Sequence, residues 1–224
     1  HPRAHLLRNG SNLGFAEGNN RGIAYALAHG ATHVALINDD MRLDPRWLTA
    51  LLAEQVLHPD AGILGGLVLF LDRPEIVNST GIEVDALGRA RDRDFERPVA
   101  ALTRPASEDV LAVTGGAMLI DRRVLDAVGA LDARLFAYYE DYDFCLRARA
   151  AGFRVRYAAE ARSWHRYAAS TGPLHPFRLF LLARNQMRLV GRYGAPAAVP
   201  FLLLGTALYR LLIKFPSLSL RGYP

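Results

Sequence analysis

The chain has 224 residues, of which 51% are apolar and 22% are charged, a composition that is typical of a folded globular protein and excludes an intrinsically disordered one. Its single cysteine, Cys145, excludes an intrachain disulfide and fits a reducing compartment. The net charge of +5 is uneven, because residues 161–224 carry nine basic and no acidic side chains, whereas the first 160 residues carry a net −4. The basic segment suggests an anionic partner, such as lipid headgroups, a diphosphate or nucleic acid.

Helical and strand-like segments alternate over the first 70 residues, at 18–30, 33–39, 46–57 and 61–70. The helical segments have apolar residues at helical spacing. Gly30 ends the first, and Asp44-Pro45 supplies an N-cap and a proline at the first helical position of the second. The strand-like segments are apolar runs, and we expect the earlier one to be a buried parallel strand. This alternation predicts an α/β sheet.

The pattern breaks at residues 72–109, where short β-prone pieces surround the charged run RARDRDFERP. We expect a surface excursion there that contains a hairpin. The apolar run 109–120 predicts another buried strand, bent at Gly115-Gly116. Asp121 is placed to cap the short helix that follows this strand.

The C-terminal part of the chain differs in character from the rest. After an alternating strand at 153–158, residues 176–194 have the apolar spacing of an amphipathic helix with an arginine face. Residues 195–209 form an uncharged run of 15 residues, shorter than the roughly 20 that a membrane span needs. We favour a helix lying in a membrane interface, and a helix packed on the body of the protein is the alternative.

Three polar residues, Asn38, Asp39 and Asp40, follow the apolar run 33–39 at its carboxyl end. Ligands of open α/β sheets bind beyond the carboxyl ends of strands, and hard divalent cations take oxygen ligands. The residues therefore form a candidate cation site. The alternative, which is favoured when the motif is taken alone, is a polar turn before the next helix.

A second acidic group, Glu140, Asp141 and Asp143, opens a helical stretch. Asp143 can pair with Arg147 four residues later, and we expect this pair to be a surface ion pair. Glu140 and Asp141 have no such local partner. If they face the same cavity as the acidic motif at residues 38–40, one of them can accept a proton from a substrate hydroxyl.

Two further motifs are weaker. His165 follows the predicted strand at 153–158 and is a metal ligand, a proton carrier or simply a packed side chain. The stretch NLGFAEGNNRG at 12–22 places three glycines ahead of a helix, which permits close approach to a phosphate-bearing ligand without matching the dinucleotide fingerprint. Aromatic residues do not interleave with the basic tail, so nucleic-acid binding is not expected.

Taken in order, five segments carry a family resemblance: NLGFAEGNNRGI, ALINDDMRLDPRWL, VTGGAMLIDRRVLDAVGALD, YYEDYDFCLRARAAGFRVRY and WHRYAAST. They resemble the inverting family-two glycosyltransferases, closest to the rhamnosyltransferase-like branch that builds bacterial cell-wall and surface polysaccharides. The match covers about residues 9–172, with a looser match in ARNQMRLV of the tail. The resemblance implies a GT-A fold, a Rossmann-like mixed α/β sheet flanked by helices. We expect a core over 1–172 and a basic amphipathic helical tail over 173–224.

The resemblance also implies roles for individual residues. Asp141 is expected to be the catalytic base, supported by Glu140, and Tyr138 and Tyr139 are expected to line the acceptor site. Asp40 and His165 would contact a Mg²⁺ or Mn²⁺ ion. The residues expected at the nucleotide-sugar donor are Asn12, Gly14, Asn20, Asn38, Asp39, Gly115 and Gly116.

The implied activity is metal-dependent transfer of a hexose, with rhamnose as a candidate, from a dTDP- or UDP-linked donor to a hydroxyl of a glycan or lipid-linked acceptor. We expect this to occur at the cytoplasmic face of the cell membrane, with peripheral membrane contact through residues 176–215. The family's usual first strand and nucleotide-binding aspartate do not precede NLGF here, so we expect weak donor binding by this chain alone. A non-catalytic remnant or a membrane-peripheral binding module is the alternative.

Overall fold

The computed structural model describes residues 4–103, 107–167, 175–194 and 199–209. The helices are α1 (Gly14–Ala28), α2 (Trp47–Leu57), α3 (Arg122–Val128), α4 (Glu140–Ala150), α5 (Pro176–Tyr193) and α6 (Val199–Tyr209), with short 3-10 helices η1 (Val99–Ala101) and η2 (Ala133–Leu135). The strands are β1 (His33–Ile37), β2 (Met41–Leu43), β3 (Ala61–Phe70), β4 (Val77–Ser79), β5 (Ile82–Val84), β6 (Ala90–Asp92), β7 (Ser107–Asp109), β8 (Ala117–Asp121) and β9 (Arg154–His165).

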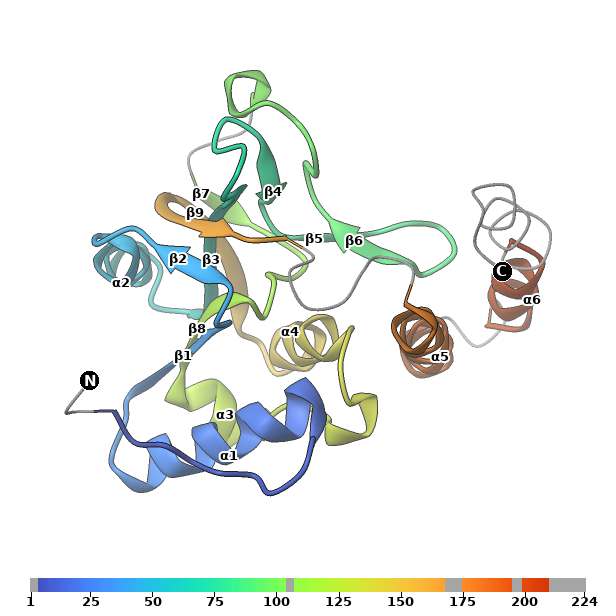
Figure 1. Cartoon of the computed structure of the whole chain (residues 1–224), viewed down its shortest axis with the longest axis horizontal. Coiled ribbons are helices and arrows are strands. Elements are labelled where there is room, and N and C mark those ends of the chain that lie inside the picture. Colours follow the sequence, from blue (N-terminus) through green and yellow to red (C-terminus); the bar gives the residue numbers. More distant parts are fainter. Residues whose placement is uncertain (1–3, 104–106, 168–174, 195–198, 210–224) are drawn as a thin grey trace.

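A mixed sheet forms the centre of the molecule (Figure 1). Its strands run in the order β1-β8-β3-β9-β2, with β4 also paired to β3 and β7 also paired to β9. The central pair β3–β9 is parallel, and the other pairs are antiparallel. The predicted mixed α/β sheet is therefore confirmed.

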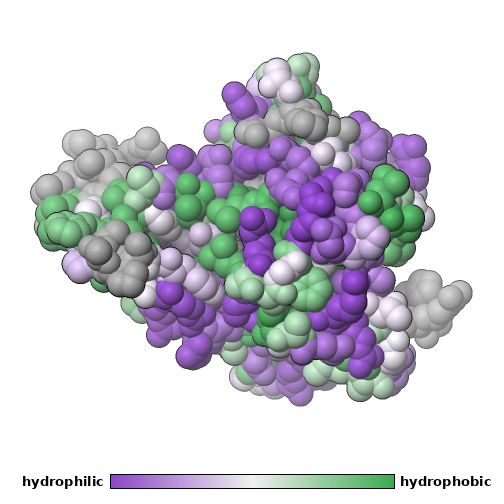
Figure 2. Space-filling model, turned by 180° about the vertical axis from the view of Figure 1, so that it is seen from behind, coloured by the Kyte–Doolittle hydropathy of each residue, from purple (hydrophilic) through white to green (hydrophobic). Residues whose placement is uncertain are grey.

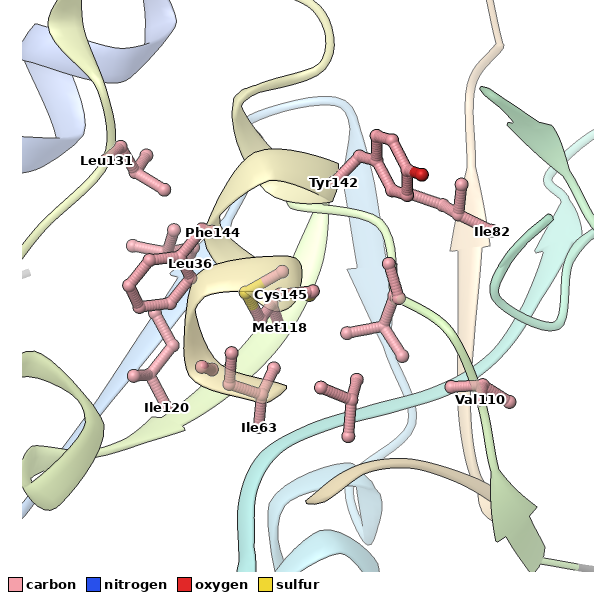
Figure 3. Close-up of a cluster of buried hydrophobic side chains, with 14 of the residues drawn as sticks. Leu36, Ile63, Ile82, Val110, Met118, Ile120, Leu131, Tyr142, Phe144 and Cys145 are labelled. Atoms are coloured by element: carbon pink, nitrogen blue, oxygen red, sulfur yellow. The ribbon is translucent and has the colours of Figure 1, made fainter. Parts of the chain in front are cut away.

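Two hydrophobic clusters hold helices against the two faces of this sheet. All ten residues of β3 are buried, because Ile63 faces the cluster under α1, α3 and α4 while Leu64 faces the cluster under α2. Phe144 and Cys145 of α4 lie against the sheet residues of the first cluster (Figure 3). This packing fixes α4, and with it the acidic residues at its start.

The strand predicted at 33–39 exists, but the expectation of a buried parallel strand is wrong. β1 lies at one end of the strand order and pairs antiparallel with β8. Its burial alternates: Val34 and Leu36 face the core, whereas Ile37 is 45% exposed. The run 109–120 is also only partly strand, because β8 begins at Ala117, after the two glycines that we expected to bend it.

The excursion at 72–109 contains the expected hairpin, formed by β5 and β6. It is not simply a surface feature, because Arg93 and Asp94 within the charged run are both buried. The Thr80 hydroxyl donates to Asp94 at 2.7 Å, and Arg93 pairs with Glu108 at 2.9 Å. The buried charges of this run are thus paired with polar and acidic side chains from neighbouring segments.

The tail helix α5 packs on the body; the choice between a membrane-interface helix and a packed helix concerned the run 195–209, which contains α6. Leu181, Leu189 and Val190 are buried, and α6 in turn lies against α5 (Figure 1). Residues 195–198 and 210–215 of the predicted membrane-contacting segment lie outside the described residues. Within the part that is described, no helix is both long and apolar enough to cross a bilayer. The predicted domain boundary at residue 172 stays a prediction.

The central strands β3 and β9 leave no room for a side chain at Gly66 of β3. A Cβ atom built there would fall on the carbonyl oxygen of Ala161 in β9, a backbone atom that cannot move aside. We expect Gly66→Ala to lower the free energy of unfolding by about 3 kcal/mol or more, as measured by urea denaturation. Gly22→Ala, on the exposed side of α1 where a Cβ meets nothing within 4 Å, is the control and should be neutral or slightly stabilising. An equal response of the two variants would contradict this packing.

Candidate active site

A cavity of about 660 Å³ opens where the start of α4 meets the loop before β8. The β5–β6 hairpin, the start of α1 and the first half of α5 complete its walls. Predicted site residues that line it are Asn38, Gly115, Gly116, Tyr138, Tyr139, Glu140 and Asp141. Residues more than a hundred positions apart in the sequence therefore meet in one space.

Asp141 is held by backbone N–H groups on both of its carboxylate oxygens. Gly115 donates to Oδ2 at 3.0 Å, and the N–H of Tyr142 donates to Oδ1 at 2.8 Å. A Cβ at Gly115 would lie 3.3 Å from the Cβ of Asp141, closer than ordinary packing, so a glycine suits this contact. The carboxylate also lies in the first turn of α4, where the helix dipole favours negative charge.

Glu140 differs from its neighbour. It is 5% exposed, lines the cavity, and its Oε2 is buried without a hydrogen-bond partner. Burial raises the pKa of Glu140 well above its ordinary value, and the charge of Asp141 raises it further. Burial also raises the pKa of Asp141, but the N–H groups of Gly115 and Tyr142 oppose that rise. The hydrogen bonds at Asp141 therefore favour its ionised form, whereas the surroundings of Glu140 raise its pKa and favour its protonated form.

A third carboxyl group in the cavity, Asp92 at the end of β6, was missed by sequence reasoning. Burial raises its pKa from 3.8 to about 6, with a smaller contribution from the charge of Asp141, while a hydrogen bond from Ser79 opposes the rise. The only sequence signal was a charged run, which is typical of a solvated surface. Asp92 instead lies in the cavity because the β5–β6 hairpin packs over it, a contact between distant parts of the chain.

The segment that leads into α4 has an unusual backbone. Phe136, Tyr138 and Tyr139 have φ angles of 65°, 70° and 75°, a region that costs non-glycine residues about 1–3 kcal/mol each. The Tyr139 hydroxyl accepts a hydrogen bond from the N–H of Ala90 at 3.2 Å, which ties this segment to the hairpin. Such strain is common at functional sites and persists where the surroundings hold it.

The glycine-rich stretch near the N-terminus supports this same segment. Gly14 has a φ of +77°, and a Cβ there would lie 2.6 Å from Phe136. The side chains of Asn12 and Asn20 lie outside the cavity; Asn20 exchanges hydrogen bonds with the backbone of Leu131 at 2.9 and 3.0 Å. The donor-binding roles of Asn12, Gly14 and Asn20 stay predictions, and their placement does not support them.

Asp40 and His165 lie together beside the cavity, where β2 pairs with the end of β9. Asp40 Oδ2 lies 3.3 Å from His165 Nε2, and Asp40 Oδ1 is buried with no hydrogen-bond partner. His165 Nδ1 lies 3.0 Å from Asn78 Oδ1, an atom that only accepts, so Nδ1 carries the proton. His165 Nε2 then either bears a second proton or presents a lone pair to the carboxylate.

The residues present fit a divalent cation. A lone pair on His165 and a carboxylate oxygen 3.3 Å apart are near the separation of about 3 Å expected for neighbouring ligands of Mg²⁺. The unpaired Asp40 Oδ1 and the histidine fixed through its other nitrogen agree with this. Among the described residues no three His, Cys, Asp or Glu side chains converge on a metal position. Water or substrate oxygens would complete the shell.

The expected single cavity for Asp40 and Asp141 is only partly realised. Asn38 and Asp141 line the cavity together, while Asp40 does not line it. Asp40 is connected to it through His165, whose ring centroid lies 5.8 Å from that of the cavity residue Tyr167. Asp39, which we expected at the donor, is exposed and also does not line the cavity.

The pairing of Asp143 with Arg147 is confirmed at 2.8 Å, but the expectation of a surface ion pair is wrong. Asp143 is fully buried, because α5 covers it and adds two further donors. Arg192 donates a hydrogen bond to Asp143 Oδ1 at 2.6 Å, and the hydroxyl of Tyr193 donates to the same oxygen at 2.7 Å. The interaction therefore joins α4 to α5.

With this geometry in place, comparison with known proteins identifies the family. The family model described as "Glycosyltransferase like family 2" matches residues 1–191. The chain belongs to this glycosyltransferase family. It adopts the GT-A fold, a central mixed sheet flanked by helices.

Individual relatives are more distant. An uncharacterised protein of Mycobacterium tuberculosis is 30% identical over 74% of this chain and 58% of its own length. The low-salt glycan biosynthesis hexosyltransferase Agl10 of Haloferax volcanii is 26% identical, over 69% of this chain and 49% of its own length. The dTDP-rhamnosyl transferase RfbF of Shigella flexneri is 24% identical, over 87% and 65%. The chain thus spans about half to two thirds of these relatives.

Among solved structures, the chain is similar to GalNAc-T7 crystallised with UDP, GalNAc and Mn²⁺. The TM-score is 0.57 at 13% sequence identity, over 98% of this chain and 47% of that one. At this identity the likeness concerns the fold.

The raised pKa of Asp92 leads to a stability prediction. In the folded state the group ionises near pH 6 instead of 3.8, so its ionisation opposes folding above about pH 4 and does so fully above about pH 6. Asp92→Asn should therefore raise the free energy of unfolding by up to about 3 kcal/mol at pH 8 and change it little near pH 4, in denaturant titrations across this range. A gain that is independent of pH would contradict the burial of this carboxyl group.

Proposed function

We propose that this chain transfers a sugar from a nucleoside-diphosphate donor to a hydroxyl of a glycan or lipid-linked acceptor, with inversion at the anomeric carbon. The observation that carries the proposal is that the neighbouring carboxyl groups of Asp141 and Glu140 share one cavity but differ in surroundings: hydrogen bonds oppose the rise in the pKa of Asp141, whereas burial and the charge of Asp141 raise the pKa of Glu140. A pair of titratable groups whose surroundings separate their pKa values is a common arrangement for acid–base chemistry.

In the proposed reaction, Asp141 accepts the proton of the acceptor hydroxyl as that oxygen attacks the anomeric carbon. The new carbon–oxygen bond forms on the face opposite the leaving group, and the bond to the diphosphate oxygen breaks, so a single displacement inverts the configuration. A positioned carboxylate base contributes on the order of 10²–10⁴-fold to such a step. The two N–H groups that hold Asp141 leave lone pairs on its oxygens for this proton.

Glu140 is proposed to position the acceptor. Its protonated carboxyl group can donate one hydrogen bond to a sugar hydroxyl and accept another, and its buried Oε2 has no partner within the protein. Tyr138 and Tyr139 also line the cavity and are proposed to stack on the acceptor. Asn38, Gly115 and Gly116 line the cavity as well and are proposed to face the donor sugar.

A Mg²⁺ or Mn²⁺ ion is proposed to be held by Asp40 and His165. Bound there, the ion would neutralise the charge that develops on the departing diphosphate. Asn78 would fix the ring of His165 so that Nε2 faces the ion position. The crystal structure of GalNAc-T7, which shares the fold, contains Mn²⁺ and UDP.

The donor and pathway are proposals from the relatives. RfbF is named a dTDP-rhamnosyl transferase and Agl10 a hexosyltransferase of glycan biosynthesis, which supports a hexose donor and, from RfbF, dTDP-linked rhamnose; a UDP-linked hexose is the other donor that we propose. We infer a role in building a cell-wall or surface polysaccharide.

Replacing the proposed base tests the function directly. Asp141→Asn keeps the size of the side chain but cannot take a proton, so transfer from dTDP- or UDP-sugars to a lipid-linked or glycan acceptor should fall by about 10²–10⁴-fold. Asp126→Asn, at an exposed carboxylate on α3 that pairs with Arg122, is the control and should keep full activity. Unchanged turnover in Asp141→Asn would remove Asp141 as the base.

Membrane association at the cytoplasmic face of the cell membrane is a further part of the proposal. Phe201, Leu204 and Leu208 share one face of α6 and are 76%, 58% and 45% exposed. Figure 2 shows apolar surface at the end of the molecule that carries this helix. The arginines of α5 contribute less than we expected, because Arg184 and Arg192 bond to the body.

Vesicle flotation tests this membrane contact. The double variant Phe201→Ser with Leu204→Ser should reduce the fraction of protein that floats with phosphatidylglycerol vesicles several-fold, because the apolar area that enters the interface is lost. Val56→Ser with Leu57→Ser is the control, since these α2 residues are 78% and 72% exposed but lie on another part of the molecule. Equal flotation of both double variants would reject α6 as the contact.

A further inference from the structure

The segment 136–139 determines where Glu140 and Asp141 lie, because it leads directly into the first turn of α4. Three of its four residues have positive φ angles without being glycine. Such a segment does not keep its shape by local preference, so contacts from elsewhere in the molecule must hold it.

One side chain from α5 bonds to two carbonyl groups of this segment and to the one just before it. Asn185 is fully buried, and its Nδ2 donates to the carbonyl oxygens of Leu135, Ala137 and Tyr138 at 2.9, 2.9 and 2.7 Å. Arg184 fixes the amide from the other side by donating from Nε to Asn185 Oδ1 at 3.0 Å. The two N–H bonds of this amide are thus shared among three carbonyl groups, those of Ala137 and Tyr138 in the segment and that of Leu135 at the end of η2.

The same helix also holds the first turn of α4. Arg192 and Tyr193 donate to Asp143 Oδ1. Through Asn185 and this pair, α5 bonds to the chain both before and after Glu140 and Asp141. Figure 1 shows α5 beside α4, away from the sheet. In addition, Arg178 and Leu182 of α5 line the cavity itself.

We propose that Asn185 is a positioning residue for the base: it holds the strained segment 136–139 and thereby places Asp141 in the cavity. The helix α5 is then a part of the active site and not only a tail that docks on it. The catalytic consequence rests on the proposed function, whereas the clamp, meaning the hydrogen bonds by which Asn185 holds segment 136–139, concerns the structure alone.

The neighbouring residue Gln186 provides a matched control. It is also fully buried and also donates to a carbonyl, that of Leu87 at 2.9 Å, and to the hydroxyl of Thr206 at 3.2 Å. These contacts join α5 to the hairpin loop and to α6 rather than to the segment before α4. Removing either amide deletes hydrogen bonds of a fully buried side chain, so both variants should lose stability.

The test compares Asn185→Ala with Gln186→Ala, at a temperature where both are folded by circular dichroism. Amide hydrogen exchange of residues 136–142 should accelerate about tenfold or more in Asn185→Ala and remain near wild type in Gln186→Ala. In the transfer assay, kcat should fall about a hundredfold in Asn185→Ala with little change in donor KM, because the base is displaced while Asn185 itself does not line the cavity that would hold the donor. Asn185→Ser, which retains one donor, should be intermediate and is used if the alanine variant does not fold.

Each outcome decides one of the two claims. Unchanged exchange at 136–142 in the Asn185 variants overturns the clamp, whatever the activity. A kcat that falls equally in the Asn185 and Gln186 variants overturns the positioning role and leaves only a general contribution to stability. If the wild-type protein transfers no sugar from any donor, the proposed function fails, and the exchange measurement still decides whether Asn185 holds the segment.

Discussion

The structure depends on keeping two adjacent carboxyl groups, those of Glu140 and Asp141, largely out of water at the start of one helix. Burying a charged group is costly unless hydrogen bonds and dipoles compensate. Asp141 receives two backbone N–H groups and the dipole of α4, whereas Glu140 receives no hydrogen bond at Oε2 and has a pKa well above its ordinary value. The same environment that makes the pair costly favours ionisation of Asp141 over ionisation of Glu140.

The surrounding elements serve this arrangement. The hydrophobic cluster under α4 fixes the helix on the sheet, and the loop before β8 brings Gly115 into contact with Asp141. The hairpin adds Asp92 and ties Tyr139 through the N–H of Ala90. The tail helix α5 reaches both sides of the pair. The helix α5, which the sequence indicates only as part of a C-terminal tail, therefore helps to hold the carboxyl pair in place.

Sequence reasoning succeeded where the signal is local. The buried run of β3 and the cap at Asp121 follow from short patterns, and the pair Asp143–Arg147 follows from helical spacing. The acidic motif at the start of α4 was recognised from its composition and from the family resemblance.

The failures concern contacts between distant parts of the chain. The pairing of β1 with β8 joins residues about 80 positions apart, and no local pattern specifies its direction. Burial of Asp143 depends on Arg192 and Tyr193, about 50 positions later. The place of Asp92 depends on how a charged hairpin folds back over the cavity. For the same reason, the donor residues assigned near the N-terminus were placed by resemblance, and Asn20 proves to bond to Leu131 instead.

The central claim is that the Asp40–His165 pair and Asp141 serve one reaction from neighbouring positions. A crystal structure with Mn²⁺ and a nucleoside diphosphate, using the anomalous signal of the metal, tests it most directly. The account predicts the ion bound to Asp40 and His165, with the diphosphate on the side that faces the cavity containing Asp141. An ion or diphosphate bound elsewhere, with Asp40 and His165 still paired to each other, would contradict it.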